Sequence, residues 1–150
     1  MLTIAAIVAI VAVINAVLPS VSRTSGALVA ASGVVQDRIS SQIDVIHATG
    51  QDGSPTADVW VKNIGASSIE PMSRVDVFFG PSGNFARIPQ GTAGCTAPCW
   101  EYTFENSTVW DATATLHITV HAGANLATGT TYYIKVVTPN GIADSKFFTV

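Results

Sequence analysis

The chain has 150 residues, of which 48% are hydrophobic and 11% are charged, and its formal net charge at pH 7 is −3. This length allows one domain together with an apolar anchor. The seven Lys and Arg residues are scattered without a basic patch, which argues against a nucleic-acid-binding surface. The sequence has no nucleophile elbow, phosphate-binding loop or His-Glu-x-x-His motif, so we expect no enzyme activity, no cofactor and no metal site.

The first eighteen residues, MLTIAAIVAIVAVINAVL, contain no charged side chain. An uncharged apolar run of about 18 residues is long enough to span a membrane as a helix. Three interpretations stay open: a cleavable secretory signal, a single membrane anchor, and a pilin-type helix that packs in a filament core. The signal fits least well, because no basic residue precedes Arg23. The residues expected to pack against lipid or neighbouring helices are Ile4, Ile7, Ile10, Val11, Ile14, Val17, Leu18, Leu28 and Val35.

Small side chains dominate residues 19–35, and Val35, Ile39 and Ile43 then follow at four-residue spacing. This spacing indicates an amphipathic helix. We therefore predict a long hydrophobic N-terminal α-helix and stalk over residues 1–42, followed by a second domain over residues 43–150. Arg23 taken alone would place its side of the membrane in the cytoplasm, whereas the second domain, described next, favours the exterior.

From residue 43 onward the hydrophobic pattern alternates with a period of two, which is typical of strands. Pro139-Asn140-Gly141 forms a hairpin turn, since Asn-Gly favours positive φ. Seven or eight short strands over about 100 residues predict an antiparallel immunoglobulin-like β-sandwich, and the chain as a whole is predicted to be α+β. The expected strands cover residues 43–50, 57–63, 74–79, 85–88, 100–105, 114–121, 132–138 and 142–150.

The histidines give no metal-binding pattern. On one strand His117 and His121 share a face but lie about 13 Å apart, at ~3.3 Å per residue, which is too far to chelate one ion. We therefore interpret both as surface residues, and we expect His47 to lie at the junction of helix and strand without a partner. The three tryptophans, Trp60, Trp100 and Trp110, are expected in the core or at the edges of the sandwich.

Cys95 and Cys99 are the only cysteines. Their spacing allows a small disulfide loop, with two reduced core thiols as the alternative; a structural zinc site would need a second pair of ligands. Asn106-Ser107-Thr108 matches the acceptor sequence for N-glycosylation at Asn106. A disulfide and a glycan both occur in oxidising, exterior compartments, so these residues favour a location of the second domain outside the cell membrane.

Four stretches together resemble a known family. They are the apolar segment that ends in NAVLP at 15–19, VWVKNIG at 59–65, DVFFG at 76–80 and YIKVVTPNG at 133–141. Over essentially the whole chain they resemble the FlaG/FlaF-type accessory proteins of the archaeal flagellum (archaellum). The DVFFG stretch is most similar to the FlaG-like branch. The related archaellins and archaeal type IV pilins share the plan of a helix followed by a sandwich.

The resemblance implies a membrane-anchored chain with its sandwich outside the membrane, acting as a static, stator-like component of a rotary motor. It also implies a FlaF-like partner that binds the surface layer. A filament subunit whose helices over residues 1–42 form the core, and hence a homo-oligomer, stays open, and so does a glycan-binding adhesin. The expected location is the cell membrane with an extracellular domain, or an extracellular filament. No Lys/Arg-Gly processing site precedes Met1-Leu2, so we expect a mature or an unprocessed chain.

Overall fold

A computed structural model describes residues 32, 33, 35, 36 and 40–150. The chain divides into two compact units, Met1–Gln36 and Asp37–Val150. Of the predicted packing residues, Val35 is described and 54% exposed. Ile4, Ile7, Ile10, Val11, Ile14, Val17, Leu18 and Leu28 lie outside the described residues. Within the described part of the chain, no helix has the length and apolar character needed to cross a membrane.

The prediction of an α+β fold with a long N-terminal helix is wrong. The described residues are nearly all β, and none of their helices reaches seven residues. The helix prediction rested on the uncharged apolar run and on the four-residue spacing of Val35, Ile39 and Ile43. The expected strand begins at Ile43, whose side chain is buried in the core. Residues four apart share a face in a helix, but they also share a face in a strand, so the spacing alone does not distinguish the two. The division into residues 1–42 and 43–150 stays a prediction.

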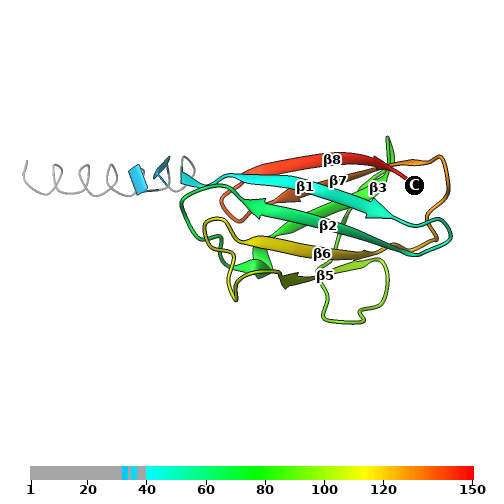
Figure 1. Cartoon of the computed structure of the whole chain (residues 1–150), viewed down its shortest axis with the longest axis horizontal. Coiled ribbons are helices and arrows are strands. Elements are labelled where there is room, and N and C mark those ends of the chain that lie inside the picture. Colours follow the sequence, from blue (N-terminus) through cyan, green and yellow to red (C-terminus); the bar gives the residue numbers. More distant parts are fainter. Residues whose placement is uncertain (1–31, 34, 37–39) are drawn as a thin grey trace, which may run out of the picture. The chain divides into compact units, whose positions relative to one another are not determined.

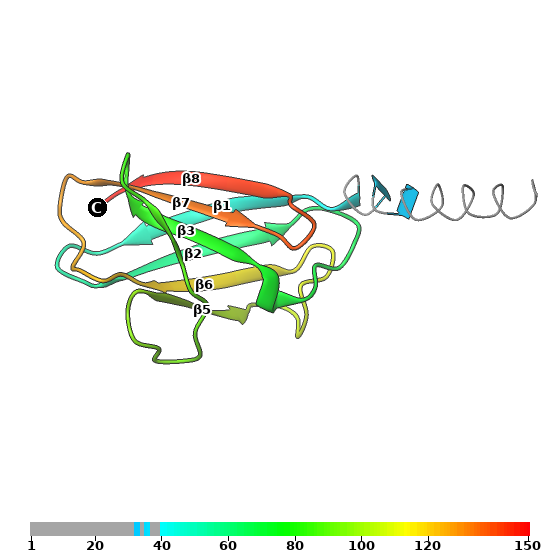
Figure 2. The ribbon, with the colours of Figure 1, turned by 180° about the vertical axis from the view of Figure 1, so that it is seen from behind.

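Two antiparallel four-stranded sheets make up the described fold, with strand orders β1-β2-β6-β5 and β4-β3-β7-β8. The two sheets form the two layers seen in Figures 1 and 2. This order is that of an immunoglobulin-type sandwich. The elements are β1 (Ile43–Gly50), β2 (Thr56–Asn63), the 3-10 helix η1 (Met72–Arg74), β3 (Asp76–Pro81), β4 (Ala86–Ile88), β5 (Cys99–Phe104), β6 (Thr115–His121), β7 (Thr131–Val137) and β8 (Ala143–Thr149).

The core follows from the alternation along the central strands. Val59 and Val61 of β2 and Leu116 and Ile118 of β6 are fully buried, and these residues face each other in the register of the two strands. Successive side chains of a strand point to opposite faces, so the residues between them lie on the outer face of the sheet. Each buried side chain of this size stabilises the fold by about 1.5–3 kcal/mol relative to exposure.

Asn63, at the end of β2, is a buried polar residue with 0% exposure. Its side-chain amide donates to the carbonyl oxygens of Ser67 and Trp110, at 2.9 and 3.0 Å, and its side-chain oxygen accepts the Gly65 N–H at 3.0 Å. These bonds satisfy the amide and fix the loop that leaves β2, because buried polar groups are costly unless hydrogen-bonded.

Side chains of β8 close one side of the sandwich against β1. Asp144 Oδ2 accepts the Val45 N–H at 2.7 Å, and Lys146 Nζ donates to the carbonyl oxygens of Val45 and Ile46 at 3.2 and 2.9 Å. A register shift between Val45 and His47 leaves Ile46 42% exposed. The backbone groups of the β1 edge are therefore occupied at this bulge, which is one way in which natural sheets avoid pairing with another chain.

Candidate functional site

The outer face of the β1-β2-β6-β5 sheet collects the three histidines of the chain, and we call it the histidine face. The strand register places His47 opposite Trp60, Trp60 opposite His117, and Thr103 opposite His117. A row of side chains therefore crosses all four strands. The histidine face comprises Asp44, His47, Asp58, Trp60, Lys62, Glu101, Thr103, Glu105, His117, Thr119 and His121.

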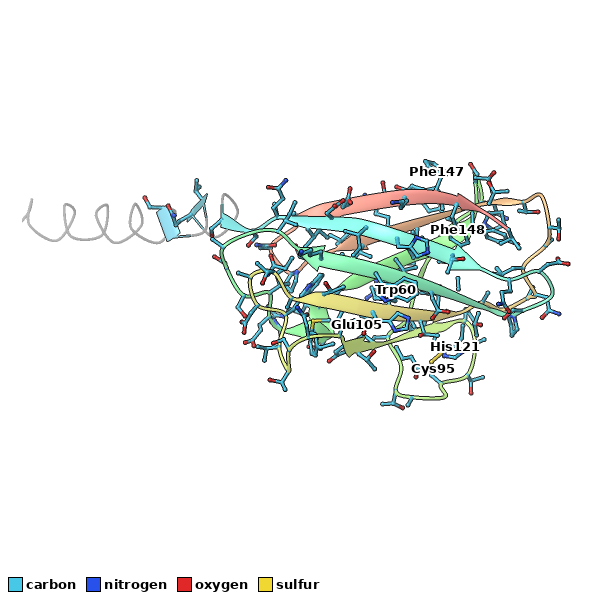
Figure 3. All side chains as sticks on the ribbon, viewed as in Figure 1. Trp60, Cys95, Glu105, His121, Phe147 and Phe148 are labelled. Carbon is cyan, nitrogen blue, oxygen red and sulfur yellow. A yellow bond between two sulfur atoms is a disulfide. The ribbon has the colours of Figure 1, made fainter. Side chains whose placement is uncertain are left out.

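Trp60 and His117 form the centre of this face. Their rings are stacked, with centroids 4.5 Å apart and an interplanar angle of 2°. Each nitrogen of His117 faces a carboxylate: Nε2 lies 3.0 Å from Asp58 Oδ1, and Nδ1 lies 3.5 Å from Glu105 Oε1. The Trp60 indole N–H donates to the same Glu105 oxygen at 3.1 Å, so Glu105 links both rings. Figure 3 labels Trp60 and Glu105 on this sheet.

His47 also belongs to this group. Its ring centroid lies 5.4 Å from that of Trp60, with a tilt of 39° between the planes. The prediction that His47 lies at a junction without a partner is therefore wrong. The period-two pattern alone does not predict the outward position of His47, because the bulge in β1 shifts the register by one residue before His47.

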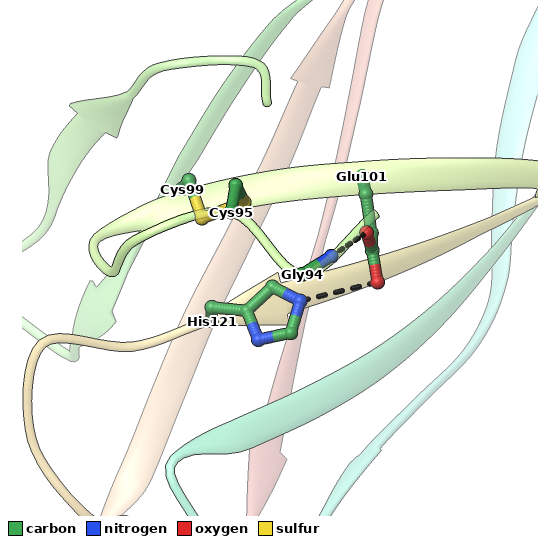
Figure 4. Close-up of a disulfide and its surroundings, with 5 residues drawn as sticks. All are labelled: Gly94, Cys95, Cys99, Glu101 and His121. Carbon is green, nitrogen blue, oxygen red and sulfur yellow. Dashed lines mark hydrogen bonds and ion pairs between the residues drawn. A yellow bond between two sulfur atoms is a disulfide. The ribbon is translucent and has the colours of Figure 1, made fainter. Parts of the chain in front are cut away.

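Near His121, the histidine face contacts the disulfide loop, which covers residues 94–99 (Figure 4). His121 Nε2 lies 3.2 Å from Glu101 Oε1, and Glu101 Oε2 accepts the Gly94 N–H at 3.0 Å. A disulfide joins Cys95 to Cys99 over a sequence separation of four. The loop is therefore held at one point by a covalent bond and at another by a carboxylate of β5.

An open cleft of about 800 Å³ lies between this loop and β5. Its lining mixes polar side chains with the apolar or aromatic ones of Ala93 and Tyr102, and the polar residues are Gln90, Thr92, Glu101, Thr103 and Thr119. Within the described residues, no group of three or more His, Cys, Asp or Glu side chains is placed to hold a metal ion. The carboxylates, imidazoles and indole at the centre of the histidine face are hydrogen-bonded or stacked with one another.

The opposite outer face, that of the β4-β3-β7-β8 sheet, carries exposed aromatic rings, and we call it the aromatic face. Phe85 lies 4.5 Å from Tyr133, and Tyr133 lies 4.8 Å from Phe147, measured between ring centroids. Phe85 is 47% exposed and Phe147 is 59% exposed. Contiguous exposed apolar groups mark interaction surfaces on many proteins. Local sequence patterns do not predict this row, since its members become neighbours only through the pairing of β7 with β3 and β8.

Asn106, the predicted glycosylation site, is exposed just beyond the end of β5. Its side-chain oxygen accepts the Thr115 N–H at 2.9 Å. The residue therefore lies on the surface with its amide held by the backbone of β6, and modification at this position stays a prediction.

A comparison with protein families matches residues 1–147 to the family described as archaeal-type flagellin. No protein among those with curated descriptions matches the chain. The family match covers nearly the whole sequence, including the apolar N-terminal segment.

Solved structures with the same fold include archaellum proteins. The archaellum periplasmic stator protein FlaG from Sulfolobus acidocaldarius is 25% identical, with a TM-score of 0.62 over 72% of this chain and 99% of FlaG. A chain of the FlaF and FlaG stator complex from the same organism is 24% identical, with a TM-score of 0.62 over 71% of this chain and 88% of that chain. The archaeal flagellum of Methanospirillum hungatei strain JF1 is 13% identical, with a TM-score of 0.67 over 99% of this chain and 90% of that chain.

The predicted resemblance to archaellum proteins is confirmed by these matches. The relatives are structural proteins, so the prediction that the chain is not an enzyme is also confirmed. The chain is an archaellum-related structural component, and it belongs to the archaeal-type flagellin family.

Proposed function

We propose that this chain is a stator component of the archaellum, a static element located outside the cytoplasmic membrane. The supporting observation is its 25% identity to FlaG, which covers 99% of that stator protein. The identity to the Methanospirillum hungatei flagellum is about half as large, at 13%. Sequence identity therefore favours the stator branch of the family.

In this role the β-sandwich transmits force between the membrane side and a partner further out. A domain that transmits force must resist deformation. The features of this sandwich that stabilise it are its buried core, the Cys95–Cys99 disulfide and the hydrogen bonds between β1 and β8. By analogy with the FlaF and FlaG complex, a FlaF-like protein is the proposed partner. The uncharged residues 1–18 hold the chain in the membrane.

The test is deletion of the gene for this chain. A stator component predicts cells that synthesise and export archaellin but do not swim, and expression of the chain from a plasmid restores swimming. Swimming at the wild-type speed in the deletion strain would contradict the proposal.

A filament subunit is the second candidate function. Two observations favour it: the family match begins at residue 1, and the Methanospirillum hungatei flagellum aligns with 99% of this chain. Filaments sheared from cells separate the two functions by mass spectrometry. A filament subunit dominates the sheared material, whereas a stator component stays with the membrane fraction.

A further inference from the structure

The two outer faces of the sandwich carry opposite charge. The histidine face holds four carboxylates, those of Asp44, Asp58, Glu101 and Glu105, and one ammonium group, that of Lys62. On the aromatic face, Arg87 is paired with Asp76, and the Lys135 ammonium lies 5.9 Å from the centre of the Phe78 ring. With neutral histidines, the described part of the histidine face is negative and that of the aromatic face is positive.

Both faces also expose aromatic rings. The aromatic face exposes the row of Phe85, Tyr133 and Phe147, and the histidine face exposes part of Trp60 beside two imidazoles. Aromatic residues are enriched at protein interfaces, where they combine a large apolar area with few rotatable bonds.

We propose that the aromatic face of one copy of this chain docks on the histidine face of a second copy. This inference rests on the proposed function as an assembled component of the archaellum. Because the two surfaces differ, the contact is heterologous, and each docked copy leaves one face of each kind free for the next. Face-to-face docking therefore generates an open row of copies.

The size of the faces sets the strength of the contact. Four strands about 4.8 Å apart and roughly 23 Å long give a face of about 440 Å², or about 880 Å² buried in total. Stable complexes bury roughly 1,200–2,000 Å². The contact is therefore weak for two chains free in solution, and it becomes significant when the N-terminal segments hold many copies at high effective concentration.

The test is cross-linking between single cysteines introduced on the two faces of the full chain in its native membrane. Phe147→Cys marks the aromatic face, and Thr103→Cys, which is exposed on β5, marks the histidine face. The native cysteines stay in their disulfide because no reductant is added. With a short bis-maleimide, we expect a cross-linked dimer when both variants are co-expressed, and no dimer when either variant is expressed alone.

Ala124→Cys is the matched control, because Ala124 is exposed in the loop between β6 and β7 and belongs to no strand of either sheet. Its co-expression with Phe147→Cys should give no dimer. Adding Lys135→Glu to the Phe147→Cys chain should abolish the mixed dimer, since the reversed charge faces the carboxylates of the histidine face.

Three outcomes would overturn the proposal. They are a dimer of Phe147→Cys alone, which indicates a symmetric contact; no dimer in the mixed cells; and a product whose mass identifies a different protein. The cross-link is read without reference to swimming, so a failure here is distinct from a failure of the stator function. If the deletion strain swims while cells that co-express the two variants show the mixed dimer, the contact is retained and the stator function is rejected.

Discussion

The indole of Trp60 and the imidazole of His117 are stacked on neighbouring strands, with ring centroids 4.5 Å apart and an interplanar angle of 2°. The two residues are partners in the register of β2 and β6, and Glu105 accepts the indole N–H while facing the imidazole. Cross-strand pairs of this kind are the unit by which side chains stabilise a sheet. The pair therefore fixes the centre of the histidine face.

Replacing both rings tests whether the pair is energetically coupled. In a double-mutant cycle of Trp60→Ala and His117→Ala, we expect a coupling free energy of about 0.5–1.5 kcal/mol, as for stacked aromatic pairs. Urea unfolding followed by circular dichroism measures it. The control cycle combines Trp60→Ala with His121→Ala, whose side chain is four residues further along β6. Equal coupling in the two cycles would show that the stack contributes nothing specific.

The amide of Asn63 should be much more sensitive. Asn63→Leu leaves the carbonyl oxygens of Ser67 and Trp110 and the Gly65 N–H without their partner in a buried site. We expect the free energy of unfolding to fall by about 3 kcal/mol or more, since each unsatisfied buried group costs ~1–3 kcal/mol. Asn125→Leu, at an exposed loop position, should change it by less than about 0.5 kcal/mol. A loss below 1 kcal/mol at Asn63 would contradict the role assigned to the amide.

The strands could be predicted because their alternation is local. The expected strand over residues 43–50 matches β1, and the inward residues Leu116, Ile118 and Val120 are fully buried. The four-residue spacing of Val35, Ile39 and Ile43 does not identify a helix by itself, because helix and strand share it.

The candidate site could not be predicted in the same way. Trp60 and His117 are 57 positions apart in sequence, and they meet only because β2 pairs with β6 in one register. Register depends on the packing of both sheets, which no local pattern specifies. The alternation does predict that Trp60, His117 and His121 point outward. It does not show that they are neighbours, because that depends on the strand order β1-β2-β6-β5. The aromatic row of Phe85, Tyr133 and Phe147 needed the order of the other sheet.

The contact between β1 and β8 should protect the chain from aggregation. Combining Asp144→Ala with Lys146→Met removes the partners of the Val45 N–H and of the Val45 and Ile46 carbonyl oxygens. We expect concentration-dependent oligomers in light scattering, because the β1 edge can then pair with another strand. Ser145→Ala, on the exposed side of the same strand, is the control and should leave the scattering unchanged. A double variant that scatters like the wild-type protein would exclude a protective role.

The disulfide should stabilise the domain modestly. A loop of the size closed by Cys95 and Cys99 contributes about 2 kcal/mol in the chain-entropy description. Cys95→Ser combined with Cys99→Ser should lower the free energy of unfolding by this amount, and reduced wild-type protein should match the double variant. Intact-mass analysis after alkylation without reductant checks the bond itself, and two alkylated thiols in unreduced protein from the native source would rule it out.

Glycosylation of Asn106 would make the native chain heavier than the 15.6 kDa of its sequence. Asn106 is exposed, and its sequon continues to the exposed hydroxyl of Thr108. We expect Asn106→Gln to remove the added mass, and Thr108→Ala to remove it as well while Asn106 stays in place, because the acceptor sequence requires a hydroxyl at that position. Asn125→Gln is the control outside any sequon and should keep the added mass. A native chain with the unmodified mass would refute the prediction, and loss of the mass in Asn106→Gln but not in Thr108→Ala would indicate a modification that does not read the sequon.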